Sequence, residues 1–223
     1  MRLPRVSENN EIRGNQASSD ALQVTQLCYE RGDQRILENL NFTVHSGKLL
    51  QVFGSNGAGK STLLRIIAGL LQPESGEIQH PDNGARKTTS TLYLGHTNGL
   101  RGGLTPRENL ILCQKLYGLS PCQETVDQAL HTLGINRLST QHINQLSAGQ
   151  QRRTALARHL IINARVWLLD EPTTSLDAEG RKCFQKQLEI FLGRGGIVIM
   201  ATHTSIDIPG RSTLNLRLGK QHD

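Results

Sequence analysis

The sequence predicts an α/β fold, in which helices pack on a largely parallel sheet and a lobe of helices is inserted in the middle of the chain. Short apolar strands alternate with helical patterns along most of the 223 residues, which is typical of parallel sheets. The strand expected at residues 49–53 runs into a glycine-rich loop, and a helix follows that loop. Two helix starts without any strand pattern occur between residues 105 and 133.

In the first half of the chain, strands are expected where apolar side chains alternate or run together. They cover residues 22–29, 40–45, 49–53 and 90–95. The helix expected at residues 61–71 places leucine and isoleucine side chains on one stripe with a 3.6-residue period. A turn over residues 73–76, which begins with proline and ends with glycine, should end this helix.

Capping residues predict three helix starts in the middle of the chain. At the first, Thr105 is the cap, Pro106 occupies the first turn, and Glu108 stands three residues after the threonine, as in a capping box. The same device is expected at the other two starts, which involve Ser120, Pro121 and Gln123, and then Ser147 and Gln150. The third helix should run to about residue 162.

The second half returns to alternating strands and a helix. The expected elements are strands at residues 166–169 and 196–201, a helix at 178–192, and an edge strand at 214–218. All these patterns together predict one domain over residues 20–223, with a helical subdomain at about 97–163. The polar residues 1–19 are expected to form a flexible tail, and they lack the apolar stretch of a secretory signal.

Charge and cysteine content narrow the class of protein. The net charge is +6 and the isoelectric point is about 9.4. Such a charge favours nucleotides, nucleic acid or an anionic membrane as partners, although an ordinary solvated surface also fits. The four cysteines are scattered without a CxxC pair, so we expect neither disulfides nor a metal site built from cysteines, and we expect a reducing compartment. No apolar run approaches the roughly 20 residues that span a bilayer, so any membrane part should come from another chain.

Residues 54–61, the phosphate loop, fit the pattern G-x-x-x-x-G-K-[ST] between a strand and a helix. Backbone N–H groups of such a loop, together with the helix N-terminus, can point at phosphate oxygens. Lys60 would bring its charge to the β- and γ-phosphates, and the Ser61 hydroxyl would ligate Mg²⁺. The residues expected to bind nucleotide are Gly54, Ser55, Asn56, Gly57, Ala58, Gly59, Lys60, Ser61 and Thr62. This loop alone does not distinguish a transport ATPase from a kinase, a GTPase or a helicase.

Two carboxylates follow the apolar strand at residues 166–169. Because α/β sheets bind ligands at the carboxyl ends of their strands, Asp170 is expected to hold Mg²⁺ through water. Side chains of successive strand residues diverge, so Glu171 can face the γ-phosphate and polarise the attacking water as a general base. Such a base contributes roughly 10²–10⁴-fold in rate.

Residues 146–150, the signature segment, read Leu-Ser-Ala-Gly-Gln at the start of a helix. A helix N-terminus with Ser147 and Gly149 can bind an anion, although Ser147 and Gln150 alone would also suit an ordinary capped helix. Together with the phosphate loop and the acidic pair, the segment resembles the LSGGQ signature of ABC-type ATPases, with Ala148 in place of the first glycine. The resemblance extends from about residue 22 to residue 218.

Membership of this family would imply a phosphate-loop NTPase core of the ABC ATPase type, with an antiparallel β subdomain and an inserted helical subdomain. In the family, the signature of one subunit binds the γ-phosphate held by the other, so two copies of the chain should sandwich ATP as a homodimer. The signature residues expected to contact ATP are Ser147, Ala148, Gly149 and Gln150.

The resemblance also implies roles for three separate residues. Tyr29 matches the aromatic residue that stacks on adenine, and Asp177 matches the D-loop that links the two active sites of the dimer. His203 follows the strand at residues 196–201 and matches the switch histidine that contacts the γ-phosphate as part of the catalytic machinery.

One position departs from the general pattern of the family. His96 stands where the family usually has a glutamine that reaches Mg²⁺ and the attacking water. A neutral imidazole nitrogen can accept from water or ligate a metal, whereas an imidazolium would be repelled by Mg²⁺. His96 is therefore expected to act at the catalytic and metal site in its neutral form.

Within the family, the chain most resembles the small ATP-binding subunits of the cytochrome c maturation system, the haem exporter. The resemblance rests on the compact length, His96, the run over residues 146–153 and the run over residues 195–203. It implies two copies docked on integral membrane subunits at the cytoplasmic face of the inner membrane. Hydrolysis would then drive haem export or release of a haem-loaded chaperone, and this chain, which has no CxxCH motif, would not bind haem itself.

Two other interpretations remain open from the sequence. The chain could serve a transporter for another cargo, such as a lipid, a drug or a metal complex. It could also be a soluble ABC ATPase acting on nucleic acid or ribosomes, which the net charge of +6 would suit. Proteins of that second kind usually carry two ATPase domains or a long coiled-coil insertion, so no nucleic-acid partner is expected here. A phosphate-loop kinase is disfavoured by the signature segment and by Asp170 and Glu171.

Overall fold

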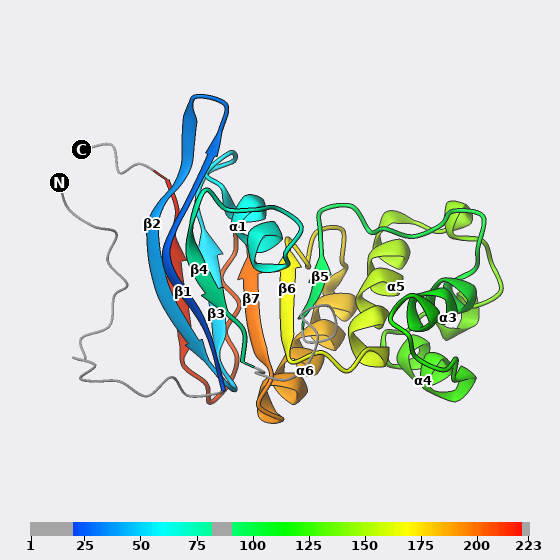
Figure 1. The fold of residues 1–223 in the computed structure, drawn as a ribbon. Helices are drawn as coiled ribbons and strands as arrows, with labels where there is room; N and C mark the ends of the chain where they lie inside the picture. The colour runs from blue at the N-terminus through cyan, green and yellow to red at the C-terminus, as the bar shows by residue number, and fades with distance from the viewer. Residues whose placement is uncertain (1–19, 82–90, 220–223) are drawn as a thin grey trace.

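Two β-sheets and a lobe of helices follow one another across the molecule (Figure 1). The computed structural model describes residues 20–81 and 91–219. The tail expected at residues 1–19, and Ser90 at the start of one expected strand, lie outside the described residues.

A parallel sheet of five strands has the order β5-β6-β7-β3-β8. The strands are β3 Leu49–Phe53, β5 Thr91–Leu94, β6 Val166–Asp170, β7 Ile197–Ala201 and β8 Thr213–Arg217. Every residue of β6 and β7 is buried, because other layers cover both faces of this sheet, and this explains their continuous apolar runs. The strands predicted at these places are confirmed, and β8 forms the predicted edge strand.

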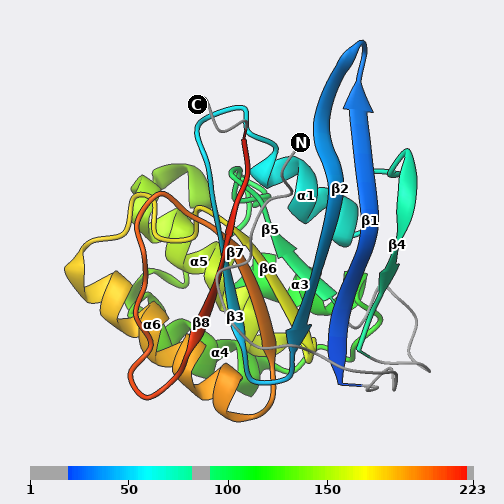
Figure 2. The same ribbon diagram turned by 90° about the vertical axis from the view of Figure 1, so that its left-hand side faces the viewer.

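A second, antiparallel sheet lies beside the first and has the order β2-β1-β4 (Figure 2). Its strands are β1 Ala21–Arg31, β2 Gln34–His45 and β4 Ser75–Gln79. The predicted turn at residues 73–76 is therefore wrong in part, because Ser75 and Gly76 already belong to β4. In that strand only Ile78 is partly buried, so no alternating apolar pattern marks it. β2 begins at Gln34 rather than at the predicted residue 40. The pattern of the sequence did not indicate the first half of this strand, because that half is mostly exposed and polar.

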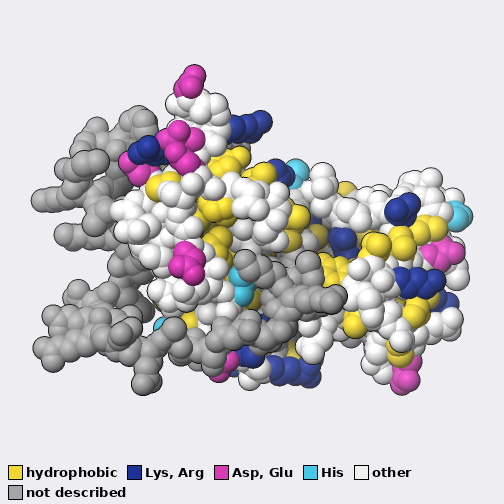
Figure 3. Space-filling view, in the orientation of Figure 1, with side chains coloured by type: hydrophobic (Ala, Val, Ile, Leu, Met, Phe, Trp, Pro, Cys, Tyr) yellow, Lys and Arg dark blue, Asp and Glu magenta, His cyan; other side chains and the backbone are white. Residues whose placement is uncertain are grey.

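β1 and β2 form a long hairpin whose turn projects beyond the rest of the sheet (Figure 2). Acidic side chains gather at this projecting end (Figure 3). There Arg35 forms ion pairs with Glu30 at 2.9 Å and with Glu38 at 3.3 Å. All three side chains are largely solvated, so the pairs contribute little to stability, and the hairpin end has the charged character of a solvated surface.

Helix α1, Lys60–Ile67, begins directly after the phosphate loop and packs against β6 and β7. Its leucine and isoleucine side chains are buried, as the predicted stripe requires. The helix ends earlier than the predicted residue 71, because Gly69 takes a left-handed φ of 72°. Leu70 consequently lies outside the helix and is 61% exposed.

The lobe consists of three helices and two short 3₁₀ turns. They are α3 Pro106–Leu116, α4 Gln123–Thr132, η1 Asn136–Leu138, η2 Ile143–Gln145 and α5 Ala148–Ile161. The capping box predicted for α3 is confirmed: Thr105 Oγ1 accepts from Glu108 N at 3.2 Å, and Glu108 Oε2 accepts from Thr105 N at 2.8 Å. These bonds pair two of the backbone donors that a helix N-terminus otherwise leaves free.

The predicted start of α4 at Ser120 and Pro121 is wrong. The helix begins at Gln123, and its N-cap is Cys122 without a side-chain capping bond. The backbone N–H of Cys122 donates instead to Gln114 Oε1, 3.1 Å away on α3. The side chain of Gln114 on the neighbouring helix therefore fixes the backbone at the N-terminus of α4.

The last helix, α6 Ala178–Gly193, crosses between β6 and β7. None of the helices in the described ranges combines the length and the apolar character that crossing a membrane requires.

Alternate residues of β6 face two separate cores, as the two-residue period of a strand requires. Val166 and Leu168 belong to the core shared with α1 and the antiparallel sheet. Trp167 and Leu169 belong to the core shared with α6 and the lobe. Because this second core is continuous from the sheet into the lobe, the lobe is held to the strands that carry the acidic pair.

Candidate active site

The phosphate loop, residues 54–61, connects β3 to α1 in a tight curve. Gly57 and Gly59 have left-handed φ values of 83° and 95°, which favour glycine. A Cβ added to Gly59 would also lie 2.8 Å from Ile36 Cγ2. Ala58 N donates to Ser55 O at 3.2 Å and closes the turn. These local constraints explain why the sequence needs glycine at two positions of the loop.

Lys60 turns its ammonium group into the curve of the phosphate loop. Its Nζ donates to Gly54 O at 2.8 Å and to Ser55 O at 3.2 Å, and the residue is 8% exposed. A full positive charge is thus fixed inside the loop, which suits the phosphate-binding role predicted for Lys60.

The N-terminus of α1 has the features of an anion site. Its N-cap Gly59 has no side chain to cap the helix, and the first turn carries no acidic residue. Ser61 and Thr62, in that first turn, are partly exposed. Backbone N–H groups in a first helical turn need acceptors from outside the helix and attract anions, so this end of α1 fits phosphate.

Asp170 ends β6 and is 2% exposed. Tyr93 Oη donates to Asp170 Oδ2 at 3.5 Å, and Arg65 on α1 interacts electrostatically with the same phenol. Burial raises the pKa of Tyr93, and Arg65 opposes that shift. Carboxylate and hydroxyl oxygens suit Mg²⁺, so Asp170 and Ser61 fit that ion chemically. Tyr93 and Arg65 belong to no motif of the sequence, because they meet only through the fold.

Glu171 follows Asp170 in a left-handed conformation, with φ at 49°. Its side chain is 19% exposed, and Oε1 is buried without a hydrogen-bond partner among the described residues. His203 Nε2 lies 3.4 Å from this oxygen but is too poorly aligned for a hydrogen bond. A residue other than glycine in this conformation is uncommon and often marks a functional site, so the geometry favours the predicted general base.

The register of the parallel sheet explains why His96, Glu171 and His203 gather at one edge. Asp170 pairs with Ala201 on β7, and the preceding residue of β6 pairs with the last residue of β5. His96 and His203 each stand two residues beyond their strands, and both are exposed. The structure therefore brings these three predicted residues to the same end of three neighbouring strands.

The signature segment begins α5 with the predicted capping box. Gln150 N donates to Ser147 Oγ at 3.3 Å, and Ser147 N donates to Gln150 Oε1 at 2.9 Å. Ser147 and Ala148 are exposed. A Cβ added to Gly149 would lie 2.6 Å from Ser175 O, so glycine permits close packing here. The surface is hollowed along Ser147, Ala148, Gly149, Gln150, Arg153, Ser175 and Asp177.

Asp177 has two contacts beside the signature segment. Its Oδ1 accepts from Gly180 N at 2.8 Å and caps α6, and its Oδ2 pairs with Arg153 at 2.8 Å. The predicted D-loop residue is thus next to the signature segment of its own chain, and the two form one surface. Its role in linking two active sites stays a prediction.

Tyr29, predicted to stack on adenine, lies on β1 and is partly buried against the core of the antiparallel sheet. It pairs across the sheet with Leu37. Leu37 lies over the phosphate loop, because a Cβ added to Gly59 would be 2.9 Å from its Cδ2. Tyr29 therefore belongs to the strand pair that covers the loop.

Arg152 is a buried residue beside the acidic pair that no motif of the sequence predicts. It is 3% exposed and donates to Asp170 O at 2.7 Å and to Glu171 O at 2.8 Å. The one signal in the sequence was its spacing, since Arg152 shares a helical face with the buried Ala155, Leu156 and His159. A buried arginine on an apolar face needs hydrogen-bond acceptors, but the sequence does not show which groups accept.

The loop, the acidic pair and the lobe together define the class of protein. A phosphate loop between a strand and a helix, with two carboxylates at the end of another strand of the same parallel sheet, is the site of a nucleoside-triphosphate hydrolase of the phosphate-loop class. The separate helical lobe that presents the signature segment distinguishes this molecule within that class.

Comparisons with known proteins narrow the class. The family model described as "ABC transporter" matches residues 37–174. The chain is 40% identical over 211 residues to the "Cytochrome c biogenesis ATP-binding export protein CcmA" of Cupriavidus pinatubonensis, with 92% of each chain covered. The protein of that name from Methylococcus capsulatus is 41% identical over 196 residues, covering 82% of this chain and 94% of the relative.

A solved structure, a putative ABC transporter ATP-binding protein from Pyrococcus furiosus, superimposes with a TM-score of 0.77 at 26% identity, covering 89% of this chain and 97% of that one. The chain belongs to the ABC transporter family, among its ATP-binding and ATP-hydrolysing subunits.

Proposed function

We propose that the chain is the ATPase subunit of the haem exporter of cytochrome c maturation, and that two copies dock on integral membrane subunits at the cytoplasmic face of the inner membrane. The observation that carries hydrolysis is the Glu171 carboxylate, whose buried Oε1 has no hydrogen-bond partner in the described part of the chain and lies 3.4 Å from His203 Nε2. The assignment to cytochrome c maturation is supported by relatives of that name, 40% identical over 92% of the chain.

The phosphate loop and α1 bind the triphosphate of ATP in this proposal. Backbone N–H groups of the loop and of the first turn of α1 donate to phosphate oxygens, and Lys60 Nζ leaves its loop carbonyls to reach the β- and γ-phosphates. Ser61, Asp170 and His96 would hold Mg²⁺, which neutralises phosphate charge and orients the γ-phosphate. Tyr29 stacks on the adenine ring.

Glu171 performs the proton transfer. Its carboxylate accepts a proton from the water that attacks the γ-phosphate, and His203 donates a hydrogen bond to a γ-phosphate oxygen. A positioned base contributes roughly 10²–10⁴-fold in rate. Ser147 and the N-terminus of α5 from the second copy of the chain complete the site, because these groups are exposed and line a hollow with Ser175 and Asp177 that includes no residue of the phosphate loop.

Replacing Glu171 by Gln tests the hydrolytic part of the proposal. The amide keeps the size of the side chain but cannot accept the proton, so turnover should fall at least about 100-fold. ATP binding should be retained, and the variant should accumulate as an ATP-bound dimer in size-exclusion chromatography. Glu179→Gln, on the first turn of α6, is the matched control and should behave as the parent. Near-normal turnover in Glu171→Gln would remove Glu171 from this role.

Cell fractionation tests the partner. The chain should be recovered with membranes only when the integral membrane subunits of the cytochrome c maturation system are co-expressed. Recovery with membranes that depends on the subunits of a different transporter would instead assign the chain to a transporter for another cargo. Co-sedimentation with ribosomes instead would favour a soluble ABC ATPase.

A further inference from the structure

Arg152 uses every N–H group of its guanidinium. Nε donates to Pro172 O at 3.2 Å. Nη1 donates to Gly95 O at 2.9 Å and to Asn98 Oδ1 at 3.1 Å. Nη2 donates to Asp170 O at 2.7 Å and to Glu171 O at 2.8 Å. A guanidinium has five such donors in a fixed plane, so this side chain is fully satisfied and its orientation is fixed.

None of the five acceptors carries a charge: four are backbone carbonyl oxygens and one is a side-chain amide oxygen. Arg152 is nevertheless buried, and desolvation lowers its pKa while the nearby Asp170 and Glu171 oppose that shift. An arginine that only needed a buried counter-ion would contact a carboxylate directly. Arg152 instead holds five oxygen atoms in fixed positions relative to one another, because its guanidinium group is planar and rigid.

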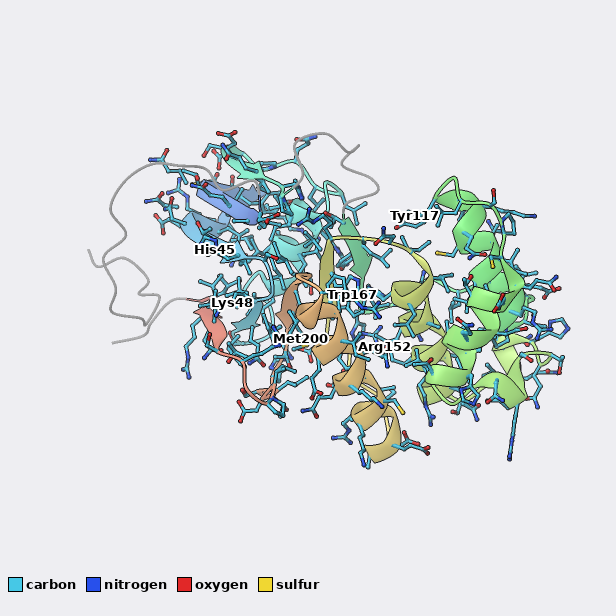
Figure 4. All side chains as sticks on the ribbon, turned by 90° about the horizontal axis from the view of Figure 1, so that it is seen from below. His45, Lys48, Tyr117, Arg152, Trp167 and Met200 are labelled. Atoms are coloured by element: carbon cyan, nitrogen blue, oxygen red, sulfur yellow. The ribbon has the colours of Figure 1, made fainter. Side chains whose placement is uncertain are left out.

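Those oxygens come from two segments of the active site, and Arg152 itself comes from a third. Gly95 and Asn98 belong to the loop that carries His96, while Asp170, Glu171 and Pro172 form the end of β6 and the following turn. Arg152 stands on α5 soon after the signature segment. Figure 4 labels Arg152 on the side of α5 that faces the sheet. A single side chain thus joins the signature helix, the His96 loop and the acidic strand end.

The contact with Glu171 has a specific consequence. Glu171 adopts φ at 49°, and such a conformation persists only when its surroundings hold it. Its N–H donates to Ala201 O at 3.0 Å, and its carbonyl accepts from Arg152 Nη2 at 2.8 Å and from Thr174 N at 3.2 Å. The direction of the Glu171 side chain therefore depends on a donor that the signature helix supplies.

We propose that Arg152 is a positioning residue for ATP hydrolysis: it couples the orientation of the signature helix, which serves the nucleotide of the second copy, to the placement of Glu171, which serves the nucleotide of its own chain. The inference rests on the proposed function of the dimer. It assigns to the interior of one chain a link between two half-sites, and this link is separate from the surface contact between Asp177 and Arg153.

Arg152→Lys tests the inference, because lysine keeps the positive charge but cannot span the His96 loop and the strand end together. The assay is steady-state ATP hydrolysis by the full-length chain against ATP concentration, with the affinity for ATP and the unfolding temperature measured on the same samples. We expect kcat to fall about 10- to 100-fold and the Hill coefficient to fall toward one, while the Kd for ATP stays within about twofold of the parent.

Arg158→Lys is the matched control. Arg158 lies on the same helix and donates to the carbonyls of Asn98, Gly99 and Ala155, so it anchors the same loop without reaching the strand end. The control should keep both kcat and the Hill coefficient of the parent. Arg152→Gln, which keeps two amide donors at a shorter reach, provides a second variant should the lysine variant fold poorly.

Three outcomes distinguish the alternatives. A lower kcat and Hill coefficient with unchanged ATP binding, in Arg152 variants but not in Arg158→Lys, supports the inference. Parent-like kinetics in Arg152→Lys, or a joint fall of kcat, ATP affinity and unfolding temperature in all these variants, overturns it and leaves Arg152 a structural residue. No ATP turnover by the parent would instead overturn the proposed function itself.

Discussion

His159 should make the fold less stable in acid. It lies on α5 with 5% exposure, and its ring centroid is 5.1 Å from that of Trp167 in an edge-on contact. Burial first, and then the charges of Arg158 and Arg152, lower the pKa of His159 from 6.5 to about 3. Backbone carbonyls of the same helix oppose this shift, but neither ring nitrogen forms a hydrogen bond of ordinary geometry with the residues that the structure describes. The native state therefore holds His159 neutral.

The size of the effect follows from the two pKa values. The contribution of neutral His159 is fully present above about pH 6.5, the value for the unfolded chain. It is lost as the pH falls from there toward the native value of about 3, because the unfolded state takes up a proton that the native state excludes. At pH 5, about 1.5 units below the unfolded value, the loss is about 2 kcal/mol. Domains are stable by only about 5–15 kcal/mol in total, so this loss is measurable.

His159→Leu removes the titrating group at similar volume. Urea unfolding should be measured at about pH 7.5 and about pH 5 for both proteins, through the fluorescence of Trp167, the single tryptophan of the chain. Between the two pH values the parent should lose about 2 kcal/mol more than the variant. His131→Leu, at the exposed end of α4, is the control and should lose as much as the parent. Equal losses in the parent and in His159→Leu would refute the reasoning.

Three further predictions concern the active site. Gly149→Ala places a methyl group 2.6 Å from Ser175 O, so the signature segment should shift and kcat should fall at least about tenfold with unchanged ATP binding, as measured by steady-state kinetics. Tyr93→Phe removes the hydroxyl between Arg65 and Asp170. In a titration of ATPase activity with Mg²⁺, the Mg²⁺ concentration at half-maximal activity should be higher than in the parent. The free energy of unfolding should fall by about 1 kcal/mol or less. His96→Gln should change the dependence of the ATPase rate on pH, because glutamine carries no titrating proton at the metal site. Identical pH profiles of the variant and the parent would contradict the role predicted for His96.

Features that depend on local chemistry could be predicted from the sequence. The capping boxes at Thr105 and Ser147 each involve residues three apart, and both are present. The buried strands β6 and β7 are continuous apolar runs that differ from the amphipathic helices around them. The phosphate loop follows a strand and precedes a helix, so its pattern also predicted the place of α1.

Features that depend on distant partners could not be predicted. β4 exists because β1 pairs with it, and its own side chains are mostly exposed. The start of α4 depends on Gln114 from another helix. The partners of Arg152 are mainly backbone carbonyls, which every residue has, so no pattern of side chains reveals them. The positions of His96 and His203 beside Glu171 depend on strand order, which the motifs implied only through the family.

The parallel register of β5, β6 and β7 determines where the chain can accept inserted residues without disturbing this site. Neighbouring strands lie about 4.8 Å apart, and backbone hydrogen bonds fix that spacing beneath His96, Glu171 and His203. The loops could therefore lengthen after His96, Glu171 and His203 without moving these three side chains. A single residue inserted within β6 would instead turn Glu171 to the opposite face of the sheet and remove the base, while every residue of the site was still present.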